Sequence, residues 1–161
     1  MKHNFLDLSK TNWGEVQQHQ YDIVVLPWGA IEPHNFHLPY ITDAIISSEI
    51  ACKSVEQAYA QANVSAVVMP PIYLGSQNPG QWELPFCIHA SYETQKAILT
   101  DIVKSLYGQG FRKLLIINGH GGNSFKSMMR DLAVTFSDFY IISSDWYNFV
   151  PRQGFFDEDI D

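Results

Sequence analysis

Short apolar segments separated by polar loops recur along the chain, and their lengths indicate buried strands. Residues 22–27, 66–69, 114–117 and 140–143 consist mostly of apolar residues. Apolar runs of this length are typical of strands covered on both faces, as in parallel sheets. The sequence therefore predicts four such strands.

Longer segments between these strands have apolar residues at helical spacing. Residues 43–63 form the first of these segments. Ser91 is placed to cap the start of a second helix, which Gly108 and Gly110 end. The third helix follows residues 118–123 and carries its apolar residues on one face: Phe125, Met128, Met129, Leu132 and Phe136.

The alternation of strands and helices favours one architecture. It predicts a mainly parallel sheet with helices on both faces, which is a three-layer α/β/α fold. A length of 161 residues is enough for one domain over residues 1–161. In such folds ligands bind beyond the carboxyl ends of the strands. Two histidine-bearing loops, 28–42 and 118–123, directly follow strands, so we expect them to share one rim of the sheet.

Composition and charge exclude several classes of function. With 46% hydrophobic and 17% charged residues, the chain has a globular composition. Its 10 Lys and Arg residues are spread thinly and its net charge is −7, so no nucleic-acid partner is expected. No apolar run is long enough to span a membrane, and the first residues lack an apolar signal segment. Cys52 and Cys87 form neither a metal-binding pattern nor a disulfide framework, and we expect a cytoplasmic protein.

The first loop concentrates groups that bind metals. In residues 32–43 (EPHNFHLPYITD), Glu32 and His34 are two positions apart, so an extended segment presents both on the same side. Asp43 lies where the next helix begins. Carboxylates and imidazoles together suit Zn²⁺, Mn²⁺ or Fe²⁺. The alternative is a polar loop in which Asp43 caps the helix, and His37 has a weaker claim than His34.

The second loop, NGHGGN at residues 118–123, surrounds His120 with glycines. Glycine permits positive φ and lets the backbone approach whatever His120 holds. A competing interpretation is a flavodoxin-like domain whose glycine-rich loop binds a phosphate or nucleotide at a helix N-terminus. That interpretation leaves His120 and the first loop unused, and the loop lacks the lysine of a P-loop. Both interpretations stay open on these residues alone.

Taken in order, the two loops resemble the motifs of the creatininase family of amidohydrolases. The matching segments are PWGA at 27–30, ExH at 32–34, HLP at 37–39, TD at 42–43 and NGHGGN at 118–123. The resemblance runs from the first strand to about residue 147. It implies a creatininase-like α/β fold whose strand-end loops hold one or two divalent metal ions, Zn, Mn or Fe. It also implies compact homo-oligomers, commonly hexamers.

By motif match the resemblance implies four metal ligands, which are Glu32, His34, Asp43 and His120, with Asp43 as the bridge. The implied reaction is hydrolysis of a C–N bond, other than a peptide bond, in a small amide that can be cyclic. The attacking group would be a metal-activated water, and Glu32 and His120 would act catalytically through the metal. Hydrolysis of a non-amide ring substrate is the alternative within the same metal chemistry.

The loop before the second helix is where contacts with the substrate are expected: Ser76, Gln77, Asn78 and Trp82. A solvated turn is the competing interpretation of these residues. The family's usual loop has a His-x-x-Phe-Pro-Gly-Thr-like stretch in this region, whereas this chain reads QWELPFCIH at 81–89. The substrate pocket is therefore expected to differ.

Two further departures concern the completeness of the metal centre. Creatininase itself has a Glu two residues after the equivalent of His120, where this chain has Gly122, so creatinine specificity is not implied. Family members also continue into a segment that brings an acid–base His and further carboxylates. We expect that segment beyond Asp161, which would make the chain a domain without its C-terminal part and inactive alone. The acidic residues 157–161 are the nearest substitute within it.

Overall fold

The structure is a computed structural model that describes residues 4–149. Its centre is a four-stranded sheet in the order β2-β1-β3-β4. The strands are β1 (Ile23–Trp28), β2 (Ala66–Val68), β3 (Lys113–Asn118) and β4 (Tyr140–Asp145). Each pairing between neighbouring strands is parallel, which confirms the predicted strands and their direction.

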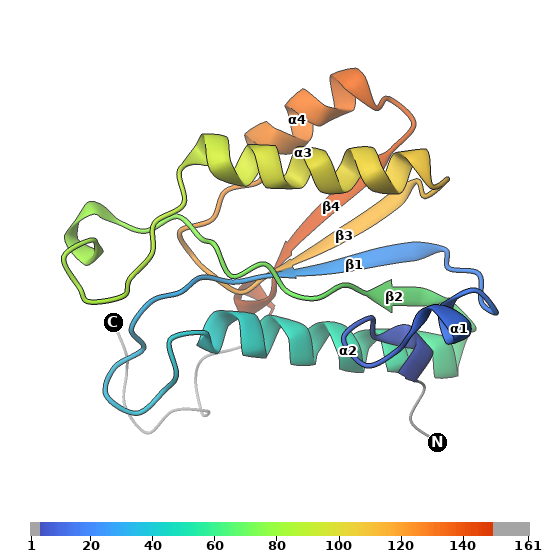
Figure 1. The fold of residues 1–161 in the computed structure, drawn as a ribbon, viewed down its shortest axis with the longest axis horizontal. Coiled ribbons are helices and arrows are strands. Elements are labelled where there is room, and N and C mark those ends of the chain that lie inside the picture. The colour runs from blue at the N-terminus through green and yellow to red at the C-terminus, as the bar shows by residue number, and fades with distance from the viewer. Residues whose placement is uncertain (1–3, 150–161) are drawn as a thin grey trace.

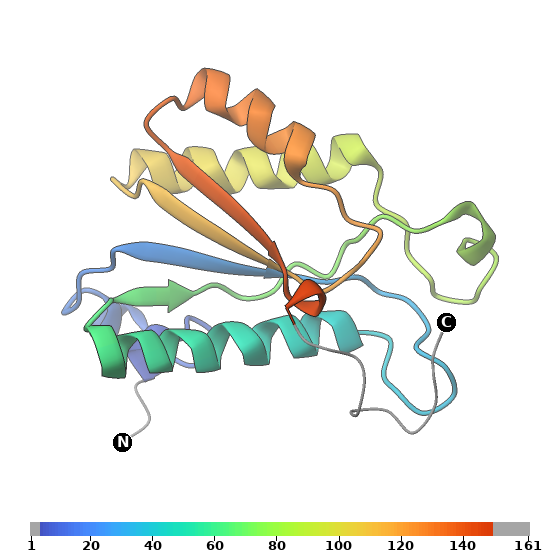
Figure 2. The same ribbon diagram turned by 180° about the vertical axis from the view of Figure 1, so that it is seen from behind.

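Helices cover both faces of this sheet, as Figures 1 and 2 show. Helix α2 (Thr42–Ala62) lies on one face, and α3 (Tyr92–Gly108) and α4 (Lys126–Thr135) lie on the other, which confirms the three-layer architecture. Short helical turns complete the described chain: η1 (Asn4–Leu6), α1 (Trp13–Val16), η2 (Pro79–Gln81) and η3 (Trp146–Asn148). Among the helices of the described residues, none has the length and apolar character needed to cross a membrane.

Local signals at the helix ends explain why the predicted boundaries lie close to the observed ones. The Ser91 side chain accepts a hydrogen bond from the backbone nitrogen of Thr94 at 3.3 Å, which caps α3. Helix α3 ends at Gly108. Gly110, two residues later, adopts a φ of 94° that turns the chain away from the helix. Helix α2 ends at Asn63, which adopts the left-handed conformation with φ of 52°.

Alternate residues of β1 divide the core between the two faces of the sheet. Val24, Leu26 and Trp28 pack with the residues of α3 and α4, and Val25 packs with those of α2. All four are at most 3% exposed. Burying a side chain of this kind stabilises the fold by roughly 1.5–3 kcal/mol. Strand β1 is therefore held from both sides, and it leads directly into the first histidine-bearing loop.

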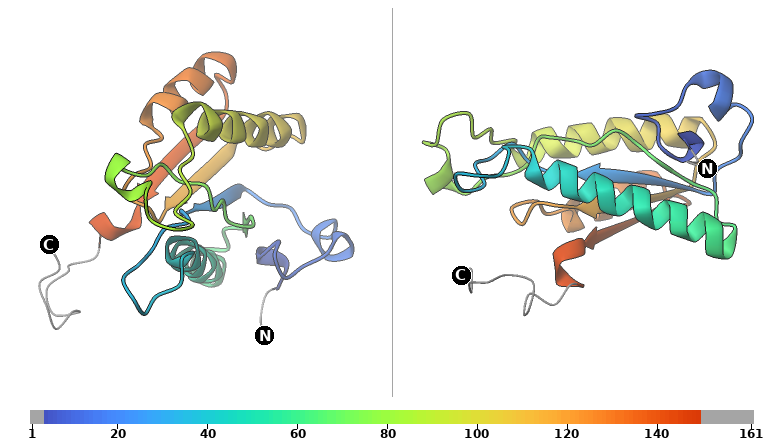
Figure 3. Two further views of the ribbon diagram at one scale, coloured as in Figure 1. Left: turned by 60° about the vertical axis from the view of Figure 1, so that its left-hand side comes forward. Right: turned by 90° about the horizontal axis from the view of Figure 1, so that it is seen from below.

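The strands β1, β3 and β4 end level with one another. Trp28 is paired with Asn118, and Asn118 is paired with Asp145. The chain segments that follow these residues therefore emerge at the same edge of the sheet. The loops after β1 and β2 also project beyond this end of the sheet in Figure 1 and in both views of Figure 3. This arrangement confirms the shared rim that the sequence predicts.

Candidate metal centre

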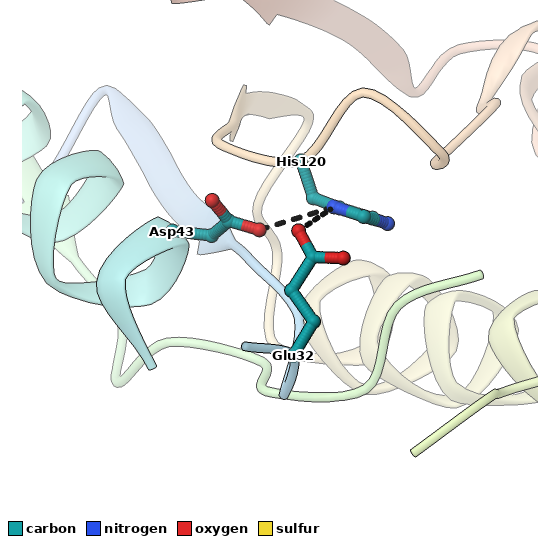
Figure 4. Close-up of side chains that lie close together, drawn as sticks. All are labelled: Glu32, Asp43 and His120. Carbon is teal, nitrogen blue, oxygen red and sulfur yellow. Dashed lines mark ion pairs between the residues drawn. The ribbon is translucent and has the colours of Figure 1, made fainter. Parts of the chain in front are cut away.

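Three side chains converge where β1, α2 and β3 meet, and Figure 4 shows them pointing toward one another. Glu32 follows β1, Asp43 lies in the first turn of α2, and His120 lies in the loop after β3. One ligand atom of each lies within 4.8 Å of the others, and the residues are 8%, 7% and 6% exposed. Two buried carboxylates and an imidazole are a donor set that suits a first-row divalent cation.

Close backbone approach brings Asp43 to the strand ends. A Cβ on Gly119 would overlap the carbonyl oxygen of Asp43, and a Cβ on Gly29 would overlap the backbone nitrogen of Ala44. Glycine at both positions lets the start of α2 lie directly against the ends of β1 and β3. The close approach expected of the NGHGGN loop is thus confirmed. The positive φ that glycine also permits does not occur in this loop, because Gly110 is the only glycine among the described residues with positive φ.

The ring of His120 is oriented by a backbone carbonyl. Its Nε2 lies 2.8 Å from the carbonyl oxygen of Ser76. Because a carbonyl oxygen can only accept, Nε2 carries the hydrogen. The other ring nitrogen, Nδ1, lies 3.0 Å from Glu32 Oε1 and 3.1 Å from Asp43 Oδ2. The atom that faces both carboxylates is therefore the one free to bind a proton or a cation.

In the metal-free protein this position holds a proton. Burial lowers the pKa of His120, but hydrogen bonds to Asp43, Glu32 and the Ser76 carbonyl outweigh burial and raise the pKa to about 10. The ordinary value for histidine is 6.5. The charged contact therefore stabilises the metal-free fold fully below about pH 6.5, and its contribution is lost as the pH rises through about 10.

His34 joins the cluster on the other side of Asp43. Its Nε2 lies 2.9 Å from Asp43 Oδ1, and its Nδ1 lies 3.1 Å from the carbonyl oxygen of Glu32. Nδ1 therefore donates to the backbone carbonyl, and Nε2 is the ring nitrogen that faces the carboxylate. Each oxygen of Asp43 faces a different imidazole, which is what a carboxylate that bridges two cations requires. The structure thus brings the four predicted ligands together, and their role as ligands remains a prediction.

Asp43 does not cap α2. The N-cap residue is Ile41, and no side chain forms a capping hydrogen bond there. Asp43 Oδ2 is buried and, apart from the His120 ring, has no hydrogen-bond donor among the described residues. The interpretation of residues 32–43 as a polar loop with a helix cap therefore leaves the position of this carboxylate unexplained.

The NGHGGN loop is poorly suited to a phosphate. The backbone nitrogens of Gly119, His120 and Asn123 all donate to acceptors within the protein. A phosphate beside His120 would also lie against the carboxylates of Glu32 and Asp43, which would repel it. The flavodoxin-like alternative therefore has no support in this geometry.

The loop of expected substrate contacts divides into residues near the cluster and residues away from it. Ser76 contacts His120 through its carbonyl oxygen. Gln77 is 4% exposed, and its side-chain amide has no partner among the described residues. Asn78 and Trp82 are exposed, and Trp82 Nε1 donates to the Gln77 carbonyl at 3.1 Å. Contact of these four residues with a substrate remains a prediction.

The sequence pattern does not predict the contact between Gln81 and Glu32. Its Nε2 donates to Glu32 Oε2 at 3.2 Å, and its Oε1 accepts from the backbone nitrogen of Asn78 at 3.2 Å. One oxygen of Glu32 is thus held by Gln81 while the other faces His120. Gln81 lies 49 residues from Glu32, so no spacing in the sequence marks the pair.

Gly122 leaves no room for the carboxylate that creatininase has at this position. A Cβ on Gly122 would overlap the Ser76 carbonyl oxygen and lie 2.6 Å from His120 Nε2.

His37 is exposed, in keeping with its weaker claim to be a metal ligand. Residues 157–161, the nearest partial substitute for the acid expected beyond Asp161, lie outside the described residues.

Sequence comparison identifies two curated relatives of the chain. A mycofactocin precursor peptide peptidase from Mycolicibacterium smegmatis is 33% identical over 102 residues, which cover 63% of this chain and 40% of that protein. A creatinine amidohydrolase from Pseudomonas putida is 26% identical over 139 residues, which cover 80% of this chain and 51% of that protein. The chain therefore spans about half, or less, of the length of these relatives.

Solved structures share the fold. A candidate creatinine amidohydrolase from Bacteroides fragilis superimposes with a TM-score of 0.95 at 53% identity, covering 99% of this chain and 63% of that one. A creatininase structure superimposes with a TM-score of 0.76 at 22% identity, covering 92% of this chain and 60% of that one. The family model described as creatininase, creatinine amidohydrolase, matches residues 9–158. The chain belongs to the creatininase family.

Proposed function

We propose that this chain binds one or two divalent cations (Zn, Mn or Fe) for the hydrolysis of a C–N bond in a small amide. The orientation of the two imidazoles carries the proposal. His34 and His120 each donate one ring N–H to a backbone carbonyl and turn the other nitrogen toward Asp43. Proteins orient metal-binding histidines in this way. Creatininase structures with Mn and with Zn also support the choice of cation.

The chain's own residues would prepare the cation site. A divalent cation held by Glu32, Asp43 and His120 would polarise an amide carbonyl and activate a water molecule. Gln81 holds one oxygen of Glu32 and leaves the other facing the site. Because His120 Nδ1 holds a proton in the metal-free protein, binding of the cation releases that proton.

We expect Ser76 and Gln77 to contact the substrate, with Asn78 and Trp82 at the exposed end of the same loop. Leaving a buried polar group unpaired costs about 1–3 kcal/mol, so the unpaired amide of Gln77 favours a polar partner in the bound state. The two curated relatives are named a peptide peptidase and a creatinine amidohydrolase. The amide bond is thus the shared part of their substrates, and creatinine itself is disfavoured here by Gly122.

Metal content and hydrolysis test this proposal together. Protein expressed from its complete natural reading frame and purified without chelator is expected to contain Zn, Mn or Fe by elemental analysis. Loaded with each cation in turn, it is expected to hydrolyse members of a panel of lactams, cyclic ureides, small formamides and short peptides. Hydrolysis of lactones alone would instead support the non-amide alternative. Protein that stays metal-free after reconstitution with every cation would contradict the metal centre.

We also propose that the protein associates with copies of itself, as the family resemblance implies. Large apolar side chains are exposed on the two loops at the rim: Phe36 is fully exposed, and Phe86 is 80% exposed. The loops are joined, because the Tyr40 hydroxyl donates to the Pro85 carbonyl at 3.0 Å. Aromatic residues are enriched at protein interfaces, so exposed aromatic side chains on two linked loops support a contact there.

Sedimentation at micromolar concentration is expected to show a homo-oligomer, with a hexamer as the expected form. The double variant Phe36→Asp/Phe86→Asp is expected to shift the protein toward monomer, because it places charges in the buried contact. Val134→Asp is the matched control, since Val134 is apolar and 85% exposed but lies on α4. A wild-type protein that sediments only as a monomer would contradict self-association.

A further inference from the structure

A buried chain of hydrogen bonds leads from Asp145 toward His120. Asn118 is fully buried, and its Nδ2 donates to Asp145 Oδ1 at 2.8 Å. A carboxylate oxygen accepts this hydrogen bond, so Asp145 fixes the orientation of the Asn118 amide, with its NH₂ group toward Asp145. Asn118 Oδ1 then accepts from the backbone nitrogen of His120 at 3.2 Å and from Asn123 Nδ2 at 3.1 Å.

Asn123 is the next residue in this series of hydrogen bonds, and both its amide NH₂ group and its amide oxygen take part. Its Nδ2 faces two acceptors, Asn118 Oδ1 at 3.1 Å and the Gly29 carbonyl oxygen at 3.3 Å. Its Oδ1 accepts from the backbone nitrogen of Ser76 at 3.1 Å. The residue is 9% exposed, so water offers little replacement for these bonds. A side chain with two N–H groups on one side and an acceptor on the other is what this position requires.

We propose that Asn123 is a positioning residue that decides which nitrogen of His120 is free to bind a cation. Asn123 holds the backbone of Ser76, and the Ser76 carbonyl accepts from His120 Nε2 at 2.8 Å. Gly122 permits this approach, because a Cβ there would overlap the same carbonyl oxygen. With the hydrogen kept on Nε2, Nδ1 is the ring nitrogen that faces Glu32 and Asp43 and can exchange its proton for a cation. This inference rests on the proposed metal centre.

The substitution Asn123→Asp tests whether Asn123 positions Ser76 and, through it, His120. Asn123→Asp keeps the size of the side chain and its acceptor for the Ser76 N–H. It places a carboxylate oxygen against Asn118 Oδ1 and the Gly29 carbonyl, where only a donor fits. The Ser76 carbonyl then loses its fixed position beside His120. Loss of such an outer partner typically weakens metal binding by about 10–100-fold, and we expect a loss in that range.

The test is a Co²⁺ titration of the metal-free protein, followed by visible absorption, which reports the ligand geometry. Asn123→Asp and the milder Asn123→Ser are both expected to lower the Co²⁺ affinity and to alter the absorption bands while circular dichroism stays unchanged. Gln61→Glu, which makes the same amide-to-carboxylate change at an exposed position of α2, is expected to match the wild type. Variants at Asn123 that keep the wild-type affinity and spectrum would overturn the proposal.

A second measurement does not depend on the folding of the variants. In the Zn²⁺-loaded wild-type protein, ¹⁵N resonances of the histidine rings are expected to show His120 protonated at Nε2. Protonation at Nδ1 would overturn the proposal. A wild-type protein that binds no Co²⁺ and no Zn²⁺ would reject the metal centre itself, whereas normal binding with insensitive Asn123 variants would reject only the role of Asn123.

Discussion

Asparagine in place of Asp43 is expected to lower the affinity for Zn²⁺ or Co²⁺ by at least about 100-fold. The change keeps the size of the side chain but removes the negative charge that faces both imidazoles, 2.9 Å from His34 Nε2 and 3.1 Å from His120 Nδ1. Asp43 is 7% exposed, so solvent cannot replace the lost charge. Competition with a chromophoric chelator measures the effect, and His120→Ala is expected to act in the same direction.

Two matched controls separate this effect from a general loss of charge or of imidazole. Glu49→Gln removes an exposed carboxylate from the same helix, and His37→Ala removes an exposed imidazole from the loop that carries His34. Both controls are expected to bind the cation as the wild type does. If Asp43→Asn also kept wild-type affinity, the cation would have to bind elsewhere.

Alanine in place of Gly122 is expected to destabilise the metal-free protein by roughly 2–3 kcal/mol, the upper part of the range for overpacking a tight site. The added methyl group would overlap the Ser76 carbonyl oxygen and lie 2.6 Å from His120 Nε2. Either the Ser76 backbone or the loop that carries Gly122 must move. The hydrogen bond between His120 Nε2 and the Ser76 carbonyl is then lost. Urea unfolding of the metal-free protein measures the stability, and Co²⁺ titration measures the accompanying loss of affinity.

The neighbouring glycine provides the control for this prediction. A Cβ on Gly121 would meet nothing within 4 Å, so Gly121→Ala is expected to change stability by less than about 0.5 kcal/mol. Equal effects of the two substitutions would show that the approach of Ser76 to His120 does not depend on Gly122. The same overlap explains why the carboxylate that creatininase has at this position cannot be added here without moving the Ser76 backbone.

The parts of the fold that the sequence predicts well are those that depend on burial along one segment. The apolar run at residues 114–117 predicts β3 because a central parallel strand is covered on both faces. Convergence of Asp43 and His120 follows from the parallel direction, which brings strand ends to one edge. The short α1 has no apolar periodicity and is exposed at Trp13, so no pattern indicates it.

The residues that hold the ligands in place could not be predicted, because their roles depend on how loops cross in space. Gln81 reaches Glu32 only through the path of the loop after β2. Asn123 belongs to the recognised NGHGGN segment, yet its partners Ser76 and Gly29 lie 47 and 94 residues away. The motif includes Asn123 without assigning it a role, and the fold is needed to show what it contacts.

The order of the strands in the sheet has a consequence for how the chain folds. β1 comes first in the sequence but lies between β2 and β3 in the sheet. During synthesis, one edge of β1 keeps unpaired backbone groups until α2, β2 and α3 have been made and β3 arrives. Parallel pairings between such distant segments form slowly. His120 follows β3, so the full set of side chains around Asp43 is present only after the segment that fills the gap beside β1 has been made.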